Sequence, residues 1–328
     1  MSDGSYFLAL ASLAVSFFTT MFLIQLWIRA AKKFNLVGKD LNKFGGPAVP
    51  EAGGLPVMFG MLAGILIYIF FKTFLIKTET HTLVLFAVMM SFILAGFLGF
   101  IDDILGWKQG LKQWQKPFLT LPIAIPLMVI DAGHHTIGVP YFGLVNLGII
   151  YPLLIIPFGI IGAANGFNML AGLNGLEAGM GAIILSTMGF VAFVTGKPWL
   201  ALIAFCAVSA LLAFLLFNKY PSKIFPGDSL TYSIGALIAI LAILGDMERI
   251  GLFLFAPYFV ELILKARYKF RFESTANTPQ KDGTLLAPEK TGSLVHIFVR
   301  QFKSELWACR GILLTEALLS LLVLISYV

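Results

Sequence analysis

Long apolar segments recur along the whole chain, and short polar stretches separate them. A helix needs roughly 20 predominantly apolar residues to cross a bilayer, and inside lipid its backbone groups must pair with one another. The pattern therefore predicts an all-α integral membrane protein with about ten transmembrane helices. The predicted helices cover approximately residues 6–28, 54–71, 82–101, 117–131, 147–164, 178–195, 199–217, 229–245, 250–266 and 309–327.

The composition excludes an ordinary soluble protein. Hydrophobic residues make up 59% of the chain and charged residues 12%, whereas a soluble domain is about half apolar and about a quarter charged. A soluble fold with this composition would expose large apolar patches. We therefore predict one polytopic membrane domain over residues 1–328, with a cytoplasmic insert at about 267–305.

Local features refine this prediction. No basic stretch precedes the first apolar segment, which favours a first membrane helix over a cleaved signal peptide. Pro122 and Pro126 predict kinks in the fourth segment. Cys206 and Cys309 lie in apolar runs without a CxxC motif or a Cys/His cluster, so we interpret them as buried apolar side chains.

Lysine and arginine are distributed unevenly between the predicted loops. If the N-terminus lies outside and the helices alternate, 19 of the 23 Lys and Arg residues fall in inner loops. Because short loops rich in Lys and Arg remain in the cytoplasm, we predict that both termini lie outside and that the active site faces the cytoplasm. The same rule explains most of the net charge of +6, so a nucleic-acid partner is not needed to account for it.

The sequence GFIDDILG places Asp102 and Asp103 at the end of the third predicted helix. Two adjacent carboxylates are unfavourable there, because they repel each other and because the helix dipole disfavours negative charge at a C-terminus. They therefore indicate a metal–phosphate site or a proton-transfer site. Lys116 directly precedes Pro117 and the fourth segment, where it is placed to meet an anion such as phosphate.

Asp228 follows Pro226 and Gly227 at the start of the eighth predicted helix. Aspartate is an ordinary helix N-cap, so a purely structural role is one interpretation. Other acids on the same membrane face favour a divalent-metal ligand. Mg²⁺ is suited to such a site because it binds one or two carboxylates together with substrate phosphates and water.

The segment ANGFNMLAGLNGLEAG, residues 164–179, is polar but contains no Lys or Arg. Asn165 and Asn168 are three residues apart and can share a helix face, and Asn174 follows among glycines that permit close backbone approach. Neutral amides suit the recognition of a base or sugar and the coordination of a metal. A helix break with polar caps is the alternative.

Basic and aromatic residues alternate in KARYKFRFES, where Arg267, Lys269 and Arg271 are the basic members after the ninth predicted helix. The run is compatible with a strand edge, a membrane-surface anchor or a clamp for a polyanion. Arginine would suit a diphosphate because its planar guanidinium donates two parallel hydrogen bonds.

Together, the ten predicted helices, the paired aspartates after the third, the Asn-rich loop after the fifth and the Gly-Asp pair before the eighth resemble the polyprenyl-phosphate N-acetylhexosamine-1-phosphate transferases. The resemblance spans nearly the whole chain. NGFNMLAGLNGLEAG is most similar to the eukaryotic and archaeal branch, which makes dolichyl-diphosphate-GlcNAc, and the inner loop PQKDGTLLAPEKTGSL resembles archaeal members. The bacterial peptidoglycan branch has an Asp-rich loop and a His-rich motif instead, whereas this chain has only His296 near that motif.

The resemblance implies transfer of GlcNAc-1-phosphate from UDP-GlcNAc to dolichyl phosphate, as in the making of lipid-linked oligosaccharides for protein N-glycosylation, with Mg²⁺ or Mn²⁺ as cofactor. It implies a multi-pass protein of the cell membrane, or of the endoplasmic reticulum membrane if the chain is eukaryotic. A homodimer stays open.

Residue roles also follow from the resemblance. It implies that Asn168 and Asp228 bind the metal. Asp102 and Asp103 would serve the lipid-phosphate nucleophile, by removing a proton or by holding the site in register, and Lys116 would neutralise phosphate. The implied substrate-binding residues are Glu51, Asn165, Gly172, Asn174, Glu177, Phe225, Lys269 and Arg271.

Within that substrate-binding set, Phe225 would stack on uracil while Gly172 and Asn174 read its edge. Lys269 and Arg271 would hold the diphosphate and the sugar. Trp107 or Trp114 would help to close the sugar pocket, and the sequence does not choose between them.

Three alternatives remain at this point. The same chemistry could use another UDP-HexNAc donor or another polyprenyl phosphate. Asp102 or Asp103 could form a covalent intermediate instead of assisting direct in-line attack. A secondary transporter is disfavoured, because transporters place their polar residues near the bilayer midplane and this chain places them at helix ends.

Overall fold

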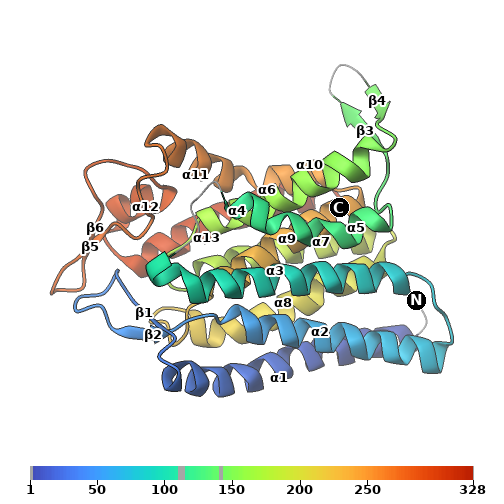
Figure 1. The fold of residues 1–328 in the computed structure, drawn as a ribbon, viewed down its shortest axis with the longest axis horizontal. Coiled ribbons are helices and arrows are strands. Elements are labelled where there is room, and N and C mark those ends of the chain that lie inside the picture. The colour runs from blue at the N-terminus through green and yellow to red at the C-terminus, as the bar shows by residue number, and fades with distance from the viewer. Residues whose placement is uncertain (1–2, 110–114, 140–142, 328) are drawn as a thin grey trace.

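The computed structural model describes residues 3–109, 115–139 and 143–327, and most of them are helical. The long helices lie side by side in one elongated bundle (Figure 1). They are α1 (Asp3–Lys33), α2 (Gly54–Phe71), α3 (Thr82–Gln109), α6 (Ile156–Met169), α7 (Leu176–Val194), α8 (Pro198–Asn218), α9 (Gly227–Gly245) and α13 (Glu305–Ile325).

Short helices extend or connect these long ones. They are η1 (Lys72–Ile76), α4 (Lys116–Thr120), η2 (Leu121–Ala124), α5 (Ile125–Val129), η3 (Tyr151–Ile155), α10 (Glu248–Leu254), α11 (Ala256–Arg267) and α12 (Leu294–Phe302). Three two-stranded antiparallel sheets lie outside the bundle and qualify the all-α prediction. They pair β1 (Val37–Lys39) with β2 (Ala48–Pro50), β3 (Thr136–Val139) with β4 (Gly143–Asn146), and β5 (Thr278–Pro279) with β6 (Leu285–Leu286).

Eight of the ten predicted segments are helices long and apolar enough to cross a membrane within the described part of the chain. The interruptions predicted at Pro122 and Pro126 are confirmed, because the segment 117–131 is the succession α4, η2 and α5, each of which has a proline in its first turn. Proline has no N–H to donate, so each ring interrupts the hydrogen bonds of the preceding turn. The predicted helix 250–266 is divided into α10 and α11, which meet at Phe255 just before Pro257.

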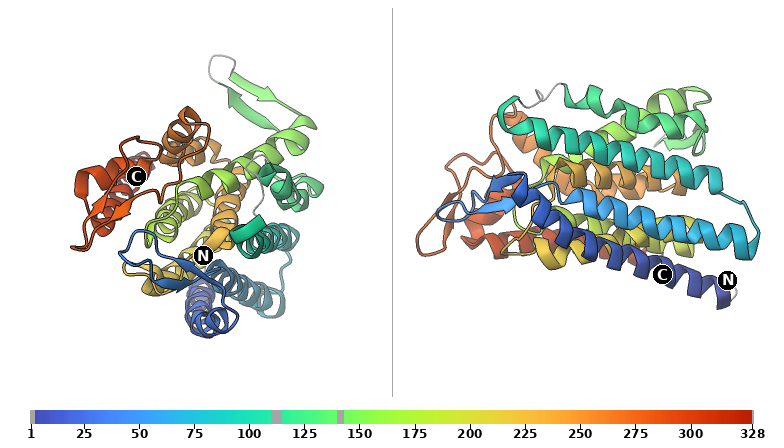
Figure 2. Two further views of the ribbon diagram at one scale, coloured as in Figure 1. Left: turned by 60° about the vertical axis from the view of Figure 1, so that its left-hand side comes forward. Right: turned by 60° about the horizontal axis from the view of Figure 1, so that its bottom comes forward.

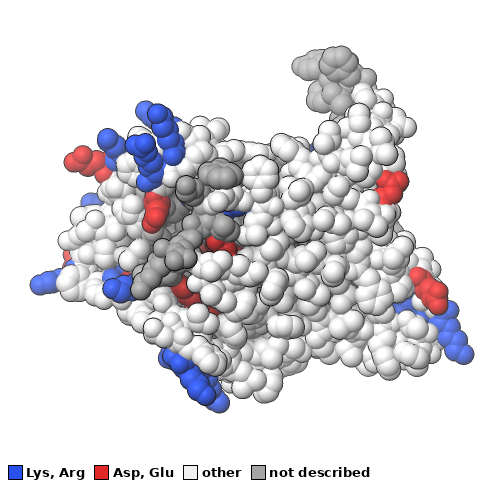
Figure 3. Space-filling model, viewed as in Figure 1, with Lys and Arg blue, Asp and Glu red and all other residues white. Residues whose placement is uncertain are grey.

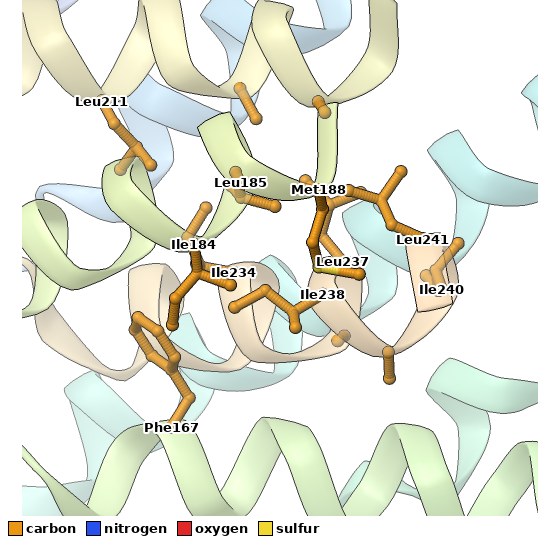
Figure 4. Packing of buried hydrophobic residues seen from close by; sticks show 14 of the residues in the cluster. Phe167, Ile184, Leu185, Met188, Leu211, Ile234, Leu237, Ile238, Ile240 and Leu241 are labelled. Atoms are coloured by element: carbon orange, nitrogen blue, oxygen red, sulfur yellow. The ribbon is translucent and has the colours of Figure 1, made fainter. Parts of the chain in front are cut away.

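The core of the bundle surrounds α9, which packs against α3, α6, α7 and α2. Figure 4 shows Ile234 of α9 near Phe167 of α6 and Ile184 of α7, with Leu237 and Ile238 further along α9. All five side chains are buried. Because lipid tails are as apolar as leucine, tight packing of this kind is what holds membrane helices together.

Glycines bring α2 and α3 very close to the first turn of α9. A Cβ at Gly54 would lie 2.2 Å from the backbone nitrogen of Leu230, and a Cβ at Gly99 would lie 2.3 Å from the carbonyl oxygen of Asp228. Neither position has room for a side chain, so the polar residues near the start of α9 are held against the end of α3.

The two ends of the bundle differ in character. We call the end that carries β1–β2, β5–β6 and α12 the loop end, and the opposite end, where both chain termini lie, the terminal end (Figures 1 and 2). On the face in Figure 3, charged side chains gather at the two ends, with most of the blue at the loop end, and the middle is nearly free of them. This distribution suits a bundle whose middle lies in lipid.

Candidate active site

Three charged side chains meet at the loop end, where α3 finishes, α4 begins and α9 begins. The Nζ of Lys116 lies 2.8 Å from Oδ2 of Asp102 and 3.1 Å from Oδ2 of Asp228. Asp102 is 3% exposed, and its Oδ2 also accepts a hydrogen bond from the Tyr232 hydroxyl at 3.0 Å. The lysine therefore forms ion pairs with two carboxylates that the fold has brought together from positions more than 120 residues apart.

Asp103 points at the start of α9. Its Oδ1 accepts from the Asp228 backbone N–H at 2.6 Å, and its Oδ2 accepts from the Ser229 N–H at 3.2 Å. The first N–H groups of a helix have no partner inside the helix, and the dipole there favours an anion. The predicted helix end before Asp102 is wrong, because α3 continues to Gln109 and Asp103 does not lie in its last turn; the N-terminus of a neighbouring helix stabilises this carboxylate.

Gly227 makes the approach of Asp103 possible. Its φ is +70°, and a Cβ there would lie 2.4 Å from Oδ2 of Asp103. Both the left-handed backbone and the missing side chain are therefore required at this position.

A cavity of ≈ 220 Å³ opens beside this ionic cluster. Its walls come from the segment after β1, from the end of α6 with the loop that follows, from the segment 225–231, and from Asn218 and Thr275. The sequence-predicted residues that line it are Asn168, Gly172, Asn174, Glu177, Phe225 and Asp228. The cavity thus joins the predicted metal ligands to the residues predicted to read the nucleotide.

Glu177 shapes the loop between α6 and α7. It is buried, and its Oε1 accepts a hydrogen bond from the Gly172 N–H at 2.9 Å. Gly172 has a φ of +102°, and a Cβ there would lie 2.6 Å from Cγ2 of Thr275. The contact that the structure gives Glu177 therefore supports the loop, and Thr275 brings the segment after α11 against it.

Asn174 is more heavily engaged than its sequence context indicated. Its Oδ1 accepts from the Ser222 N–H at 2.7 Å and from Nζ of Lys43 at 2.8 Å. Its own backbone N–H donates to Oε1 of Glu305 at 2.8 Å. The carboxamide oxygen is thus already satisfied, while the amide nitrogen, 3.3 Å from Oδ2 of Asp40, keeps a second hydrogen to donate.

Sequence reasoning missed the polar wall contributed by the segment after β1. Lys39, Asp40 and Asn42 line the cavity, and Lys43 joins Asp40 to Glu305 by ion pairs. In the sequence, Lys39 and Lys43 indicate only the orientation of the chain in the membrane. No local pattern indicated this wall, because the burial of Asp40, which requires a paired partner, is visible only in the fold.

Several predicted residues lie elsewhere. Asn165 does not line the cavity, and its amide donates to Oγ1 of Thr120 and to the Ile161 carbonyl, both at 2.9 Å. Glu51 follows β2 outside the cavity lining, and its carbonyl accepts from Nε1 of Trp27 at 2.9 Å.

The basic run after α11 also lies apart from the cavity. Lys269 and Arg271 are exposed and do not line it. The side chain of Trp107, and Trp114 altogether, lie outside the described residues. The roles predicted for these four residues stay predictions.

A second buried network holds the loop-end segments against α6. Oε2 of Glu261, which is fully buried, accepts from the Leu294 N–H at 2.6 Å. Oε1 of Glu261 lies 3.3 Å from Nζ of Lys265. That lysine in turn donates to the Met169 carbonyl at 2.6 Å. Since Met169 follows Asn168 directly, the network fixes the end of α6 at the cavity.

His296, in α12, belongs to the same region. Its Nδ1 accepts from the Gly292 N–H at 3.3 Å and its Nε2 lies 3.1 Å from the Glu273 carbonyl. Burial lowers the pKa of His296 below the ordinary histidine value. The ring is therefore neutral at pH 7 and has a structural role here, joining α12 to the segment after α11.

The donor set at the cavity fits a hard divalent cation. In the described part of the chain, no three His, Cys, Asp or Glu side chains form a group that could hold a metal on their own. Asn168 and Asp228, however, line one cavity from the end of α6 and the start of α9. One carboxylate and one amide suit Mg²⁺, which takes its remaining ligands from phosphate and water.

The chain is similar in sequence to several known proteins. Residues 85–246 match glycosyl transferase family 4. A protein of Saccharolobus solfataricus is 41% identical over 89% of this chain and 86% of its own length. A protein of Sulfolobus acidocaldarius is 35% identical over 89% of this chain and 87% of its own. Both carry the provisional name UDP-N-acetylglucosamine–dolichyl-phosphate N-acetylglucosaminephosphotransferase.

More distant relatives have a different name. A phospho-N-acetylmuramoyl-pentapeptide-transferase of a Geobacillus species is 30% identical over 80% of this chain and 83% of its own length. All three alignments are longer than the matched region 85–246.

Proposed function

Because this chain belongs to glycosyl transferase family 4, we propose that it transfers GlcNAc-1-phosphate from UDP-GlcNAc to dolichyl phosphate, giving dolichyl-diphosphate-GlcNAc and UMP. The names of the two archaeal relatives support this choice of substrates. The observation that carries the proposal is the cluster of Asp102, Lys116 and Asp228, of which Asp228 lines a polar cavity at one end of an apolar bundle. A water-soluble nucleotide and the phosphate of a membrane lipid can meet at such a place.

The proposed reaction is one phosphoryl transfer. An oxygen of the lipid phosphate attacks the β-phosphorus of UDP-GlcNAc, and the bond from that phosphorus to the bridging oxygen breaks, so that UMP leaves with the bridging oxygen. Such reactions depend mainly on positioning and on stabilising negative charge. A phosphate monoester is largely ionised near pH 7, so a strong base is dispensable.

We propose the following roles for the residues that line the cavity and for Lys116 of the ionic cluster. Phe225 offers the ring for uracil, and the nitrogen of the Asn174 amide is the donor that remains for its edge. Lys116 is the cation for the transferred phosphate, and it can exchange one of its carboxylate partners for a phosphate oxygen. Asn168 and Asp228 would hold Mg²⁺ or Mn²⁺, which supplies positive charge to the diphosphate.

We also propose the membrane arrangement that the sequence predicts: ten crossings, both termini outside and the site facing the cytoplasm. The path of the chain supports it, because α10 and α11 together return from the terminal end toward the loop end, as do α3 and α6 (Figure 1). The gathering of Lys and Arg at the loop end supports the orientation. The membrane is the cell membrane, or the endoplasmic reticulum membrane in a eukaryote.

The test is release of UMP by the purified protein with UDP-GlcNAc, dolichyl phosphate and Mg²⁺. Asp228→Asn keeps the shape of the side chain but removes its charge, and we expect kcat to fall by at least about 100-fold, as for loss of one key electrostatic contact in an active site. Asp131→Asn is the control, since Asp131 is an exposed acid at the terminal end that pairs only with His135 among the described residues. Absence of metal-dependent turnover with any polyprenyl phosphate refutes the proposal.

The second candidate is the same chemistry with a different donor or lipid. It is favoured by the relatives named phospho-N-acetylmuramoyl-pentapeptide-transferase. Competition of other UDP-HexNAc donors against UDP-GlcNAc, and of shorter or unsaturated polyprenyl phosphates against dolichyl phosphate, separates the two candidates by their kcat/KM values.

A further inference from the structure

A second cavity, of ≈ 680 Å³, lies at the terminal end of the bundle, remote from the ionic cluster. It is enclosed by the beginning of α1, the end of α2 with η1, the beginning of α8 and the end of α9. Its volume falls within the range of about 300–1,000 Å³ that is usual for small-molecule sites. None of the residues that we assign to the transfer reaction lines it.

Lys72 is the unusual residue of this cavity. It is only 6% exposed, although it lies at the end of an apolar helix. Within the described residues no carboxylate forms an ion pair with it, and its ammonium group contacts the Thr80 carbonyl and lies 5.9 Å from the centre of the Tyr68 ring. A buried ammonium without a counter-ion is costly. The Lys72 ammonium group therefore lacks a negatively charged partner among the described residues.

The neighbouring charged groups do not supply that charge. Lys197 also lines the cavity, but Asp246 pairs with it and with His134, so this group is close to neutral. His81 stacks on Trp199 with ring centres 4.5 Å apart. Burial and the Lys72 charge lower the pKa of His81. Its ring therefore lines the cavity as a neutral group at pH 7.

The start of α8 adds to the attraction for an anion. Lys197 is its N-cap residue, and no side chain caps the helix there. Pro198 has no N–H and the Leu200 N–H donates to the Lys197 carbonyl, so the start of α8 adds mainly the positive end of its helix dipole to the charge of Lys72. An anion such as phosphate is attracted by both the ammonium group and the helix dipole.

The remaining walls are apolar. Leu8, Ile76, Leu202 and Leu244 line the cavity, with the Trp199 ring. Ile76 is 48% exposed and ends a helical segment that is apolar enough to cross a membrane, so this wall of the cavity lies at the apolar outer surface of the bundle. A small hydrated ion would leave these walls without a partner, whereas an acyl-chain stem would cover them.

We propose that this cavity binds the phosphate group of a membrane lipid, with Lys72 as the counter-ion and the apolar walls receiving the first part of the lipid stem. The bound phosphate completes the ion pair that the protein alone leaves open. The proposal does not depend on the identity of the transferase substrates, because the two cavities lie at opposite ends of the bundle.

Binding of short-chain lipids to the full chain in neutral detergent tests this. The probes are dioctanoyl phosphatidic acid, dioctanoyl phosphatidylcholine as a lipid without net charge, and glycerol phosphate as a phosphate ester without a stem. The variant is Lys72→Met, which keeps most of the apolar stem. The matched control is Lys77→Met, since Lys77 is an exposed lysine five residues further on that does not line the cavity.

We expect dioctanoyl phosphatidic acid to bind the unaltered protein and raise its Tm, and Lys72→Met to weaken that binding at least tenfold while Lys77→Met changes it less than twofold. Without lipid, Lys72→Met should melt no lower than the unaltered protein, because it removes a buried unpaired charge, and UMP release should be unchanged. Equal binding to Lys72→Met, or binding of phosphatidylcholine as tight as that of phosphatidic acid, overturns the proposal. If glycerol phosphate binds as tightly as dioctanoyl phosphatidic acid and Lys72→Met weakens its binding, the cavity is a phosphate site for a soluble ester. That result overturns the proposal that its ligand is a lipid.

Discussion

Asp103 should act by positioning α9, and the comparison of Asp103→Asn with Asp103→Ala tests this role. Its two oxygens accept the backbone N–H groups of Asp228 and Ser229, so both are occupied by the protein itself. A carboxylate used in this way is poorly placed to take a proton from a lipid phosphate or to attack phosphorus. Asparagine keeps one acceptor oxygen in the same place, whereas alanine keeps none.

The magnitude follows from the bonds that are lost. A hydrogen bond to a charged group contributes about 1.5–3 kcal/mol, and about 1.36 kcal/mol corresponds to a tenfold change in rate. If the energy of one such bond is lost from the correct placement of Asp228, kcat of Asp103→Ala should fall roughly 10- to 150-fold. Asp103→Asn can keep the bond to the Asp228 N–H with a neutral acceptor, which contributes about 0.5–1.5 kcal/mol, so its kcat should fall less than that of Asp103→Ala.

The assay is UMP release at saturating substrates over a series of Mg²⁺ concentrations. A positioning role also predicts that Asp103→Ala needs a higher Mg²⁺ concentration for half-maximal rate, because Asp228 is our proposed metal ligand. For Asp103→Asn, this Mg²⁺ concentration should lie between those of Asp103→Ala and the unaltered protein. Asp131→Asn again serves as a control for the general effect of losing an acid. If Asp103→Asn is as inactive as Asp103→Ala, with unchanged Mg²⁺ dependence, the carboxylate is a base or nucleophile and the positioning argument is wrong.

Two further substitutions examine how the loop end is built. Gly227→Ala should lower kcat at least tenfold, since its Cβ would lie 2.4 Å from Oδ2 of Asp103, whereas Gly196→Ala, with a similar φ of +82° but open space, should leave the rate of UMP release unchanged. Glu261→Gln should lower the Tm by several degrees and speed proteolysis between α11 and α12, because breaking a buried ion pair costs about 3–5 kcal/mol. Glu273→Gln removes an exposed acid from the same segment and should leave both the Tm and the rate of proteolysis unchanged.

The long helices could be predicted from the sequence because lipid imposes a simple length rule. Eight segments obey it. The rule fails where prolines decide the local backbone: the segment that begins at Lys116 is divided by Pro122 and Pro126, and the segment after α9 is divided near Pro257. Apolar composition specifies that a segment is buried in lipid, but it does not specify that the segment is one unbroken helix.

The site was predictable in part for a similar reason. Asp228 and Asn168 lie in short motifs whose residue types already indicate metal chemistry, and the structure brings both to one cavity. The ties of Asn174 to Lys43 and Glu305 could not be anticipated, because they join residues more than 130 positions apart in sequence. Such contacts depend on how helix ends meet, which no local pattern records.

The paired acids illustrate this limit most clearly. Within α3 alone, Asp102 and Asp103 are adjacent acids that repel each other, and their spacing cannot tell which of them does chemistry. The start of α9 separates their environments: Asp103 receives two backbone N–H groups, while Asp102 shares Lys116 with Asp228 beside the cavity. Adjacent residues on a helix point about 100° apart, so one neighbour can anchor a helix while the other faces the substrate. The repulsion between the two carboxylates is thus offset by two different positive partners, a helix dipole for one and an ammonium group for the other.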